Sequence, residues 1–178
     1  MMKKNPLLII LTGESGVGKS TFINCLKCGC NWYESSREIV RLLRKSGEKV
    51  MHDTIHNMAT KKYEENPYWQ VPMILSELEK KDFLIYDGPR RIAEVRELLR
   101  KCPRAIVIRI IANDKIRLGR LKQRDNINIK DFRRIKRHES KETQLNQILN
   151  LAVIVIGNNE SLVELQEKAN AVRTCFNF

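Results

Sequence analysis

The sequence predicts an α/β protein with a doubly wound parallel sheet, on the basis of three patterns. Five short apolar runs, most of them rich in branched aliphatic residues, are separated by amphipathic stretches, and the first run leads directly into a glycine-rich turn. Near-continuous apolar runs are typical of strands that helices cover on both faces. Strands that alternate with helices form parallel sheets of this class. A chain of 178 residues is long enough for one such domain.

The expected elements alternate along the whole chain. Strands are expected at residues 7–12, 30–33, 82–86, 105–111 and 151–156, and the second, "CNWY", gives the weakest signal. Apolar residues recur at three- and four-residue spacing in the stretches between them, which predicts helices. The expected helices span residues 19–27, 36–45, 54–65, 68–80, 92–99, 114–123, 130–148 and 162–172. The sequence holds no internal repeat and no Gly/Ser-rich linker, so we expect one core.

Positive charge is concentrated in one part of the chain. The net charge is +12, and residues 101–141 alone carry 14 Lys and Arg against 4 Asp and Glu. Such a segment can bind nucleic acid or close over phosphate groups, and composition leaves both interpretations open. Phe132 is the one aromatic residue of this segment. Because grooves for single-stranded nucleic acid use several stacking aromatics, we do not expect a nucleic-acid partner.

Cysteine usage and hydropathy indicate a cytoplasmic protein. The five cysteines are odd in number and come without a secretory context, which predicts reduced thiols. Cys25, Cys28 and Cys30 are close in sequence, but no second Cys or His pair stands at a distance that would complete a zinc site. The run Leu7–Leu11 is too short for a signal-peptide core, and no run reaches the roughly 18 apolar residues of a membrane span.

A phosphate-binding loop follows the first expected strand. In "GESGVGKST", Gly13, Gly18, Lys19 and Ser20 match the pattern G-x-x-x-x-G-K-[ST]. A buried strand, a turn whose N–H groups converge on phosphate oxygens, and a following helix are the context that this chemistry needs. We expect Lys19 to bridge the β- and γ-phosphates and Ser20 to offer its hydroxyl to Mg²⁺. The expected ATP-binding residues are Gly13, Glu14, Ser15, Gly16, Val17, Gly18, Lys19, Ser20 and Thr21.

A second polar motif, "IYDGPRR", closes the third expected strand. Phosphoryl transfer needs a metal site, cations on the migrating charge and an acceptor held in line. Asp87 is expected to hold Mg²⁺ directly or through water, and Arg90 to offer a bidentate donor to a phosphate. An Asp-Gly turn followed by solvent-exposed arginines is the alternative, which the neighbouring phosphate-binding loop disfavours.

These motifs resemble those of the P-loop nucleoside monophosphate kinases, adenylate kinase above all, and of related kinases that include dephospho-CoA kinase. The stretch "DGPRRIAEV" is similar to the Asp-Gly-x-Arg and Glu-Val pattern of a compact adenylate-kinase-related group. The resemblance implies a three-layer P-loop kinase fold whose five-stranded parallel sheet has the order 2-3-1-4-5. It divides the single domain 1–178 into a core (1–35, 81–112 and 149–178), acceptor-binding helices (36–80) and lid-like basic helices (113–148).

The resemblance also implies which residues bind the acceptor. Arg90 and Arg41 are expected to contact it, together with Asp87, and a solvated charge stripe is the alternative for Arg41. Ser35 or Ser36 is expected to cap the helix of Arg41. Glu94 stands where adenylate kinases have Gln. Because a carboxylate only accepts hydrogen bonds, Glu94 would suit a base edge rich in N–H donors, such as that of guanine.

Two alternatives concern residues near the acceptor site. Glu94 can instead pair at the surface with Arg91, on a helix that also carries Glu97. Tyr68 and Trp69 can stack on a base or simply pack in the core.

The basic segment resembles the lid of the same family. Arg120 and Arg124 match its Arg-x-x-x-Arg and are expected to close over the triphosphate, while Arg134 and Arg137 reach the transferred and acceptor phosphates. A cationic lid excludes water and gathers charge around the phosphates. After the last strand, Asn158 is expected to contact the donor base, and a turn followed by a Ser161 helix cap explains it as well.

The sequence therefore predicts a monomeric ATP- and Mg²⁺-dependent kinase that moves the γ-phosphoryl group to a nucleoside monophosphate or a similar small nucleotide. The alternatives are a dephospho-CoA kinase-like enzyme and a nucleic-acid-associated P-loop ATPase. A regulatory protein with a degenerate acceptor site is disfavoured, because the loop and strand-end motifs are intact. The expected catalytic residues are Lys19, Arg90, Arg120, Arg124, Arg134 and Arg137.

Overall fold

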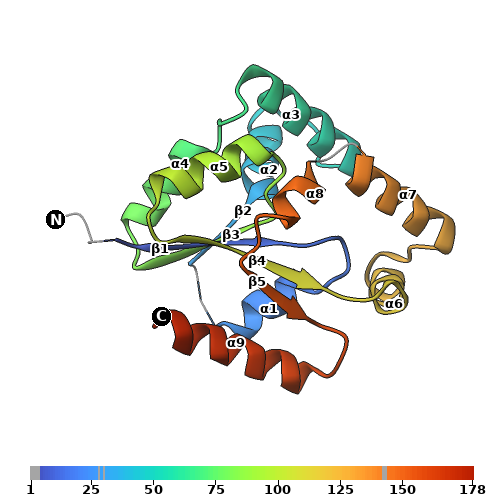
Figure 1. The fold of residues 1–178 in the computed structure, drawn as a ribbon. Coiled ribbons are helices and arrows are strands. Elements are labelled where there is room, and N and C mark those ends of the chain that lie inside the picture. The colour runs from blue at the N-terminus through green and yellow to red at the C-terminus, as the bar shows by residue number, and fades with distance from the viewer. Residues whose placement is uncertain (1–4, 28, 30, 142–143) are drawn as a thin grey trace.

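The computed structural model describes residues 5–27, 29, 31–141 and 144–178. Its centre is a five-stranded, wholly parallel sheet in the order β2-β3-β1-β4-β5. The strands are β1 (Leu7–Thr12), β2 (Trp32–Glu34), β3 (Phe83–Asp87), β4 (Ala105–Ile111) and β5 (Ile154–Gly157). This topology confirms the predicted fold class and strand order, and Figure 1 shows helices on both sides of the sheet.

Each face of the sheet carries its own hydrophobic core. The helices α1 (Lys19–Cys25) and α9 (Leu162–Phe176) cover one face, and α4 (Val71–Glu79), α5 (Ile92–Lys101) and α8 (Leu145–Leu149) cover the other. Side chains alternate along β1, so that Ile9 packs in the first core and Ile10 in the second, both fully buried. Because successive strand residues point to opposite faces, one continuous apolar run serves both layers.

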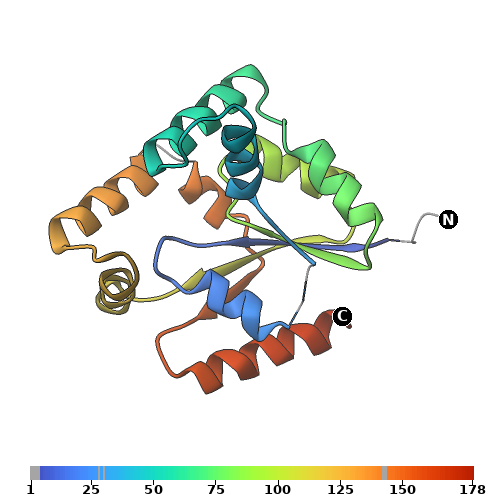
Figure 2. The same cartoon turned by 180° about the vertical axis from the view of Figure 1, so that it is seen from behind.

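Two helical excursions leave the sheet (Figure 2). The helices α2 (Ser35–Lys45) and α3 (His52–Glu65) form a third apolar cluster around Leu43 and Trp69, and α6 (Asp114–Asp125) is followed by α7 (Ile129–Lys141). The rings of His56 on α3 and His138 on α7 lie edge to face with centroids 5.4 Å apart. The two excursions therefore touch each other.

Three local expectations were wrong. Residues 130–148 form two helices, α7 and α8, because Leu145, Ile148 and Leu149 turn back onto the core; residues 142 and 143 lie outside the described part of the chain. The last strand begins at Ile154, after a short turn whose Val153 N–H donates to Val107 O at 3.0 Å. Neither Ser35 nor Ser36 caps α2, since the cap position is Glu34.

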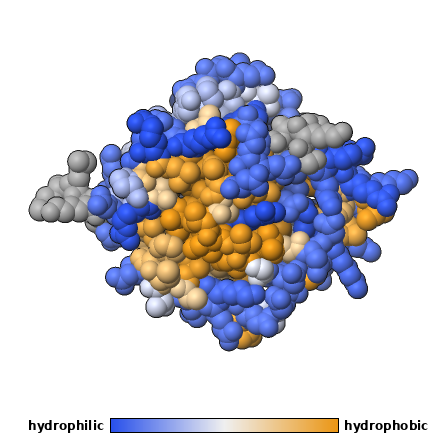
Figure 3. Space-filling model, in the orientation of Figure 1, coloured by the Kyte–Doolittle hydropathy of each residue, from blue (hydrophilic) through white to orange (hydrophobic). Residues whose placement is uncertain are grey.

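The β5 edge of the sheet presents apolar side chains to solvent. Val153 and Val155 are 71% and 55% exposed, and Figure 3 shows an apolar area on the side of the molecule that carries β5. None of the described helices is long and apolar enough to cross a membrane.

Candidate active site

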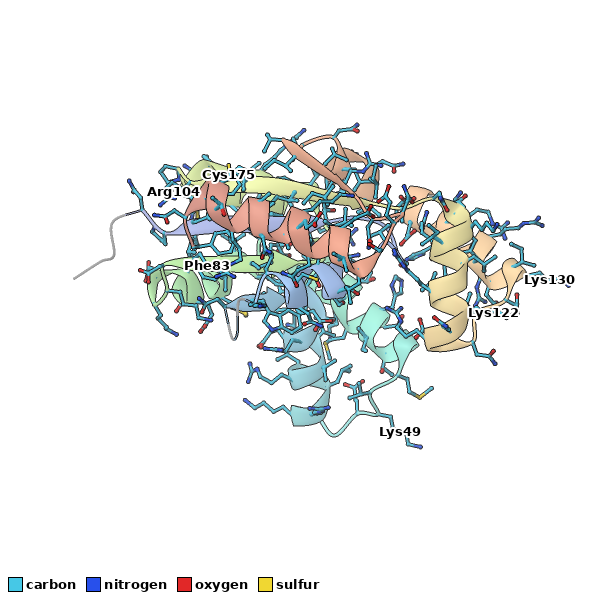
Figure 4. All side chains as sticks on the ribbon, turned by 90° about the horizontal axis from the view of Figure 1, so that it is seen from below. Lys49, Phe83, Arg104, Lys122, Lys130 and Cys175 are labelled. Atoms are coloured by element: carbon cyan, nitrogen blue, oxygen red, sulfur yellow. The ribbon has the colours of Figure 1, made fainter. Side chains whose placement is uncertain are left out.

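The candidate residues gather at the carboxyl edge of the sheet. Leu11 of β1 is the register partner of Asp87 on β3, and the Gly88 N–H donates to Leu11 O at 3.2 Å, so the loops after the two strands start side by side. Figure 4 shows Lys122 on α6 and Lys130 on α7 at one end of the molecule, and Phe83 at the start of β3 towards the opposite end. The lid-like helices thus stand at the end where the strands finish.

The phosphate-binding loop requires glycine at three positions, Gly13, Gly16 and Gly18, where a Cβ would come within 3.0 Å of another atom. Gly18 has φ +97°, and a Cβ there would lie 2.3 Å from Nδ2 of Asn158. A Cβ on Gly13 would lie 2.6 Å from the carbonyl oxygen of Ile110. Such contacts leave no room for a side chain, and glycine alone adopts the left-handed conformation without strain. The glycines of the motif therefore set the close approach of the loop to β4 and to the loop after β5.

Lys19 is held over this loop by main-chain oxygens. Its Nζ donates to the carbonyl oxygen of Gly13 at 2.8 Å and to that of Glu14 at 3.3 Å. Burial lowers the pKa of the ammonium, while the carboxylate of Asp87 raises it. The ammonium thus lies between the loop and the end of β3, where phosphate oxygens are expected.

Asp87 offers oxygen to a cation. Its side chain is buried, and neither its Oδ1 nor Thr12 Oγ1 has a hydrogen-bond partner among the described residues. The pKa of the Asp87 carboxyl is raised, and burial is the largest cause. The charges of Lys19 and Arg90 lower this pKa, whereas that of Glu34 raises it. A buried carboxylate oxygen without a partner suits a hard cation, and Mg²⁺ usually takes one or two protein oxygens. Asp87 and the exposed hydroxyl of Ser20 therefore fit the expected Mg²⁺.

No group of three or more His, Cys, Asp or Glu side chains is arranged to hold a metal in the part of the chain that the structure describes. Cys28 and Cys30, which stand near Cys25 in sequence, lie outside that part.

Arg120 and Asn158 meet behind the loop. Arg120 Nη1 donates to Val17 O at 3.1 Å and its Nη2 donates to Asn158 O at 3.1 Å. The Asn158 amide also donates to Val17 O, at 2.8 Å, and its side chain is buried. The structure therefore brings these two predicted residues to the loop from α6 and from the end of β5. Ser161 caps α9 as expected, because its Oγ accepts from Glu164 N at 3.3 Å.

A second cluster at the loop was not selected from the sequence. Arg117 of α6, 1% exposed, donates from Nε to Ser15 O at 2.9 Å. Glu139 of α7 accepts from the Ser15 N–H at 2.6 Å and from Arg117 Nη2 at 3.1 Å. Arg117 could have been selected from the sequence, because it stands three residues before Arg120 and shares its helix face. Nothing in the local sequence marked Glu139 as part of the site.

The other predicted arginines lie at the surface. Arg41 pairs with Glu38 and its side chain is 62% exposed, while Arg124 and Arg134 pair with Asp125 and Asp131 of their own helices. Arg90 is exposed beside the end of β3. Arg137 is also exposed and lines a pocket of about 260 Å³. The other lining residues are Glu14, Lys136, Glu139, Leu145 and Asn146. The roles of these arginines in binding phosphates stay predictions.

Glu94 lies inside the protein rather than at its surface. It is fully buried, and its Oε2 accepts from Tyr86 at 2.6 Å and from Tyr63 at 3.3 Å. Burial raises its pKa to about 7, and its Oε1 has no partner among the described residues. The alternative of surface pairing is therefore wrong for Glu94. Glu97 pairs instead with Arg100 and Lys101.

The two aromatic candidates differ in exposure. Trp69 is 9% exposed and lies edge to face with Tyr63, whereas Tyr68 is 44% exposed. Trp69 thus packs in the core cluster beneath α2 and α3.

No protein-family model matches the sequence, and no curated protein matches it. Solved structures match it over nearly the whole chain. A shikimate kinase from Acinetobacter baumannii, in complex with shikimate, aligns with a TM-score of 0.59 at 20% identity, over 97% of this chain and 94% of that one. A dephospho-CoA kinase from Campylobacter jejuni gives 0.55 at 18% identity, over 94% and 95%. A gluconokinase from Sinorhizobium meliloti gives 0.53 at 15% identity, over 98% and 97%. Together with the strand order and the loop after β1, these likenesses show that the chain has the P-loop kinase fold.

Proposed function

We propose that the protein is an ATP- and Mg²⁺-dependent phosphotransferase that moves the γ-phosphoryl group to a small acceptor, with nucleoside monophosphates as the first candidates. The observation that carries the proposal is the proximity of Lys19, which begins α1 after the phosphate-binding loop, to Asp87, which ends β3: each shifts the pKa of the other. A cation for phosphate and a carboxylate for a metal are the pair that phosphoryl transfer needs.

Each part of the site then has a task. The loop N–H groups bind the donor phosphates, Lys19 neutralises charge between the β- and γ-phosphates, and Arg120 holds the loop against the segment after β5. Asp87 and Ser20 would hold Mg²⁺, which neutralises charge on the phosphate oxygens when it is bound with ATP. Residues 36–80 bind the acceptor beside Arg90, and residues 113–148 close over the phosphates and exclude water.

A hydroxyl compound is the second candidate acceptor, and one observation favours it. Glu34 ends β2 as the register partner of Asp87, so two carboxylates stand at adjacent strand ends. A hydroxyl group loses a proton during phosphoryl transfer and a carboxylate can accept it, whereas a phosphate acceptor is already an anion. Carboxylates at this position also repel an acceptor whose reacting group is a phosphate, but not one whose reacting group is a neutral hydroxyl. This arrangement supports a dephospho-CoA kinase-like reaction.

The basic segment is poorly suited to binding nucleic acid by stacking. Phe132, its one aromatic residue, is 3% exposed and lies beneath the guanidinium of Arg117, whose Cζ is 5.3 Å from the ring centroid. A buried ring offers no platform to a base.

The decisive experiment incubates the purified protein with Mg²⁺ and ATP and one acceptor at a time. Ribo- and deoxynucleoside monophosphates represent phosphate acceptors, and dephospho-CoA, shikimate and gluconate represent hydroxyl acceptors. Phosphorylated product, absent with Lys19→Ala, is expected from one class. If the acceptor is a hydroxyl compound, Glu34→Gln should lower its turnover while leaving ATP binding unchanged. Absence of product from every acceptor would refute the proposal.

A further inference from the structure

Both main-chain groups of Ser15 are bound by the lid-like helices. The Ser15 N–H donates to Glu139 Oε1 on α7 at 2.6 Å, and the Ser15 carbonyl accepts from Arg117 Nε on α6 at 2.9 Å. These partners lie 124 and 102 residues away along the chain. A segment of the phosphate-binding loop is therefore fastened to two helices of the basic segment.

The two side chains that make these bonds are buried and bound to each other. Arg117 is 1% and Glu139 6% exposed, and Arg117 Nη2 donates to Glu139 Oε2 at 3.1 Å. Arg117 Nη1 also donates to Glu14 Oε1 at 2.8 Å and to Asp114 Oδ1 at 3.2 Å. A buried guanidinium needs several acceptors in fixed positions, and here carboxylates of the loop, α6 and α7 supply them.

Gly16 brings the loop against the backbone of α6. A Cβ on Gly16 would lie 2.9 Å from the carbonyl oxygen of Arg117 and 3.1 Å from Leu121 Cγ. Residues 14–16 thus pack onto the lid-like helices through side chains and main chain together.

We propose that Glu139 and Arg117 are positioning residues, a brace that fixes residues 14–16 and so preorganises the rest of the loop for the phosphates of ATP. The inference rests on the proposed function, because it assigns the loop to a nucleotide. Preorganised N–H donors bind a phosphate without first losing freedom, which raises affinity. The brace also makes nucleotide affinity depend on the placement of α6 and α7.

The same contact has an opposite interpretation, in which Glu139 competes with a phosphate of ATP for the loop. A carboxylate on a loop N–H can stand in for a phosphate, in which case Glu139 would have to leave when ATP binds. The second oxygen of Glu139 is held by Arg117, however, and Arg117 also holds the Ser15 carbonyl, which no phosphate can bind. The brace explains all three bonds, and the two interpretations predict opposite effects of removing the carboxylate.

The test measures binding of a non-hydrolysable ATP analogue with Mg²⁺ by calorimetry in three variants. Glu139→Ala removes both bonds and should raise the Kd at least tenfold. Glu139→Gln keeps an acceptor for Ser15 but turns an amide N–H₂ towards Arg117, so a smaller rise is expected. The control Glu167→Gln removes an exposed carboxylate from α9, outside the phosphate-binding loop and the lid-like helices, and should leave the Kd within twofold. At saturating ATP, the KM for the acceptor should stay unchanged in all three.

An unchanged or lower Kd for Glu139→Ala, with a circular dichroism spectrum like that of the wild type, would overturn the brace. Hydrogen exchange of the peptide that contains Ser15 supplies an independent readout without nucleotide. The Ser15 amide should be protected in the wild type and in Glu167→Gln and exchange faster in Glu139→Ala; equal exchange would also overturn the proposal. If the wild type binds no ATP at all, the proposed function fails, and the exchange experiment still tests the brace.

Discussion

The buried carboxyl of Glu94 should make the stability of the protein depend on pH, and Glu94→Gln isolates this effect. Burial raises its pKa from 4.5 to about 7 in the folded protein. A group with a raised folded pKa binds its proton more tightly when folded, so its contribution to stability is complete below pH 4.5 and is lost as pH rises through 7. At 1.36 kcal/mol per pKa unit, the loss amounts to about 3 kcal/mol.

The assay follows urea unfolding by tryptophan fluorescence at a series of pH values between 4.5 and 8. A glutamine has no proton to lose, and other titrating groups cancel in the difference between the two proteins. Glu94→Gln should therefore match the wild type near pH 4.5 and exceed its free energy of unfolding by about 3 kcal/mol at pH 8. The control is Glu97→Gln on the same helix; the Glu97 side chain is 23% exposed and pairs with Arg100. Relative to that variant, the wild type should not lose stability as pH rises.

A difference between wild type and Glu94→Gln that stays constant with pH would refute the reasoning. It would mean that Glu94 keeps its charge inside the protein, with Tyr86 and Tyr63 stabilising the carboxylate as well as water does. A difference that shrinks as pH rises would refute it more strongly.

Three further predictions concern the loop and the acceptor side. Lys19→Ala should abolish phosphoryl transfer, measured as ADP release. Arg90→Ala should spare ATP binding, measured by calorimetry, and lower kcat/KM for the acceptor; an equal loss of ATP affinity in both variants would overturn the role of Arg90. Gly18→Ala should raise the Kd for ATP and lower the free energy of unfolding by about 1–3 kcal/mol, because its Cβ would meet Asn158 at φ +97°. If this variant unfolds in urea with the same free energy as the wild type, the expected strain at residue 18 is contradicted.

The sheet and the phosphate-binding loop were predictable because their signals are local. The bounds of β1 and β4 agree with the expected 7–12 and 105–111, since buried parallel strands read as continuous apolar runs. The break between α7 and α8 was not predictable, because residues 136–144, "KRHESKETQ", contain no apolar residue that would give a period and no Gly or Pro that would mark a stop. The two helices separate because Ile148 of α8 packs into the core with α5, whereas α7 lies against the phosphate-binding loop.

Glu94 and Glu139 show why burial of charge escapes sequence reasoning. Both carboxylates stand in strongly charged surroundings, "AEVRE" and "KRHES", that are typical of exposed helix faces. Each is buried because its partners come from distant parts of the chain: Tyr63 for Glu94, and Ser15 and Arg117 for Glu139. A single sequence holds no record of such pairs.

Four arginines of the basic segment divide into two pairs, and the division bears on the function of the segment. Arg117 and Arg120 turn inward and bind main-chain carbonyls of the phosphate-binding loop, whereas Arg124 and Arg134 turn outward and pair with a nearby Asp. A nucleic-acid groove would need its cations free along one surface, since it acts by displacing counterions from a run of phosphates. Here the innermost cations are fixed to a loop that matches the pattern of nucleotide-binding loops. Under the proposed function, the charge of residues 101–141 would serve the nucleotide site first, and the outward arginines are the ones that a closing movement would have to bring to the phosphates.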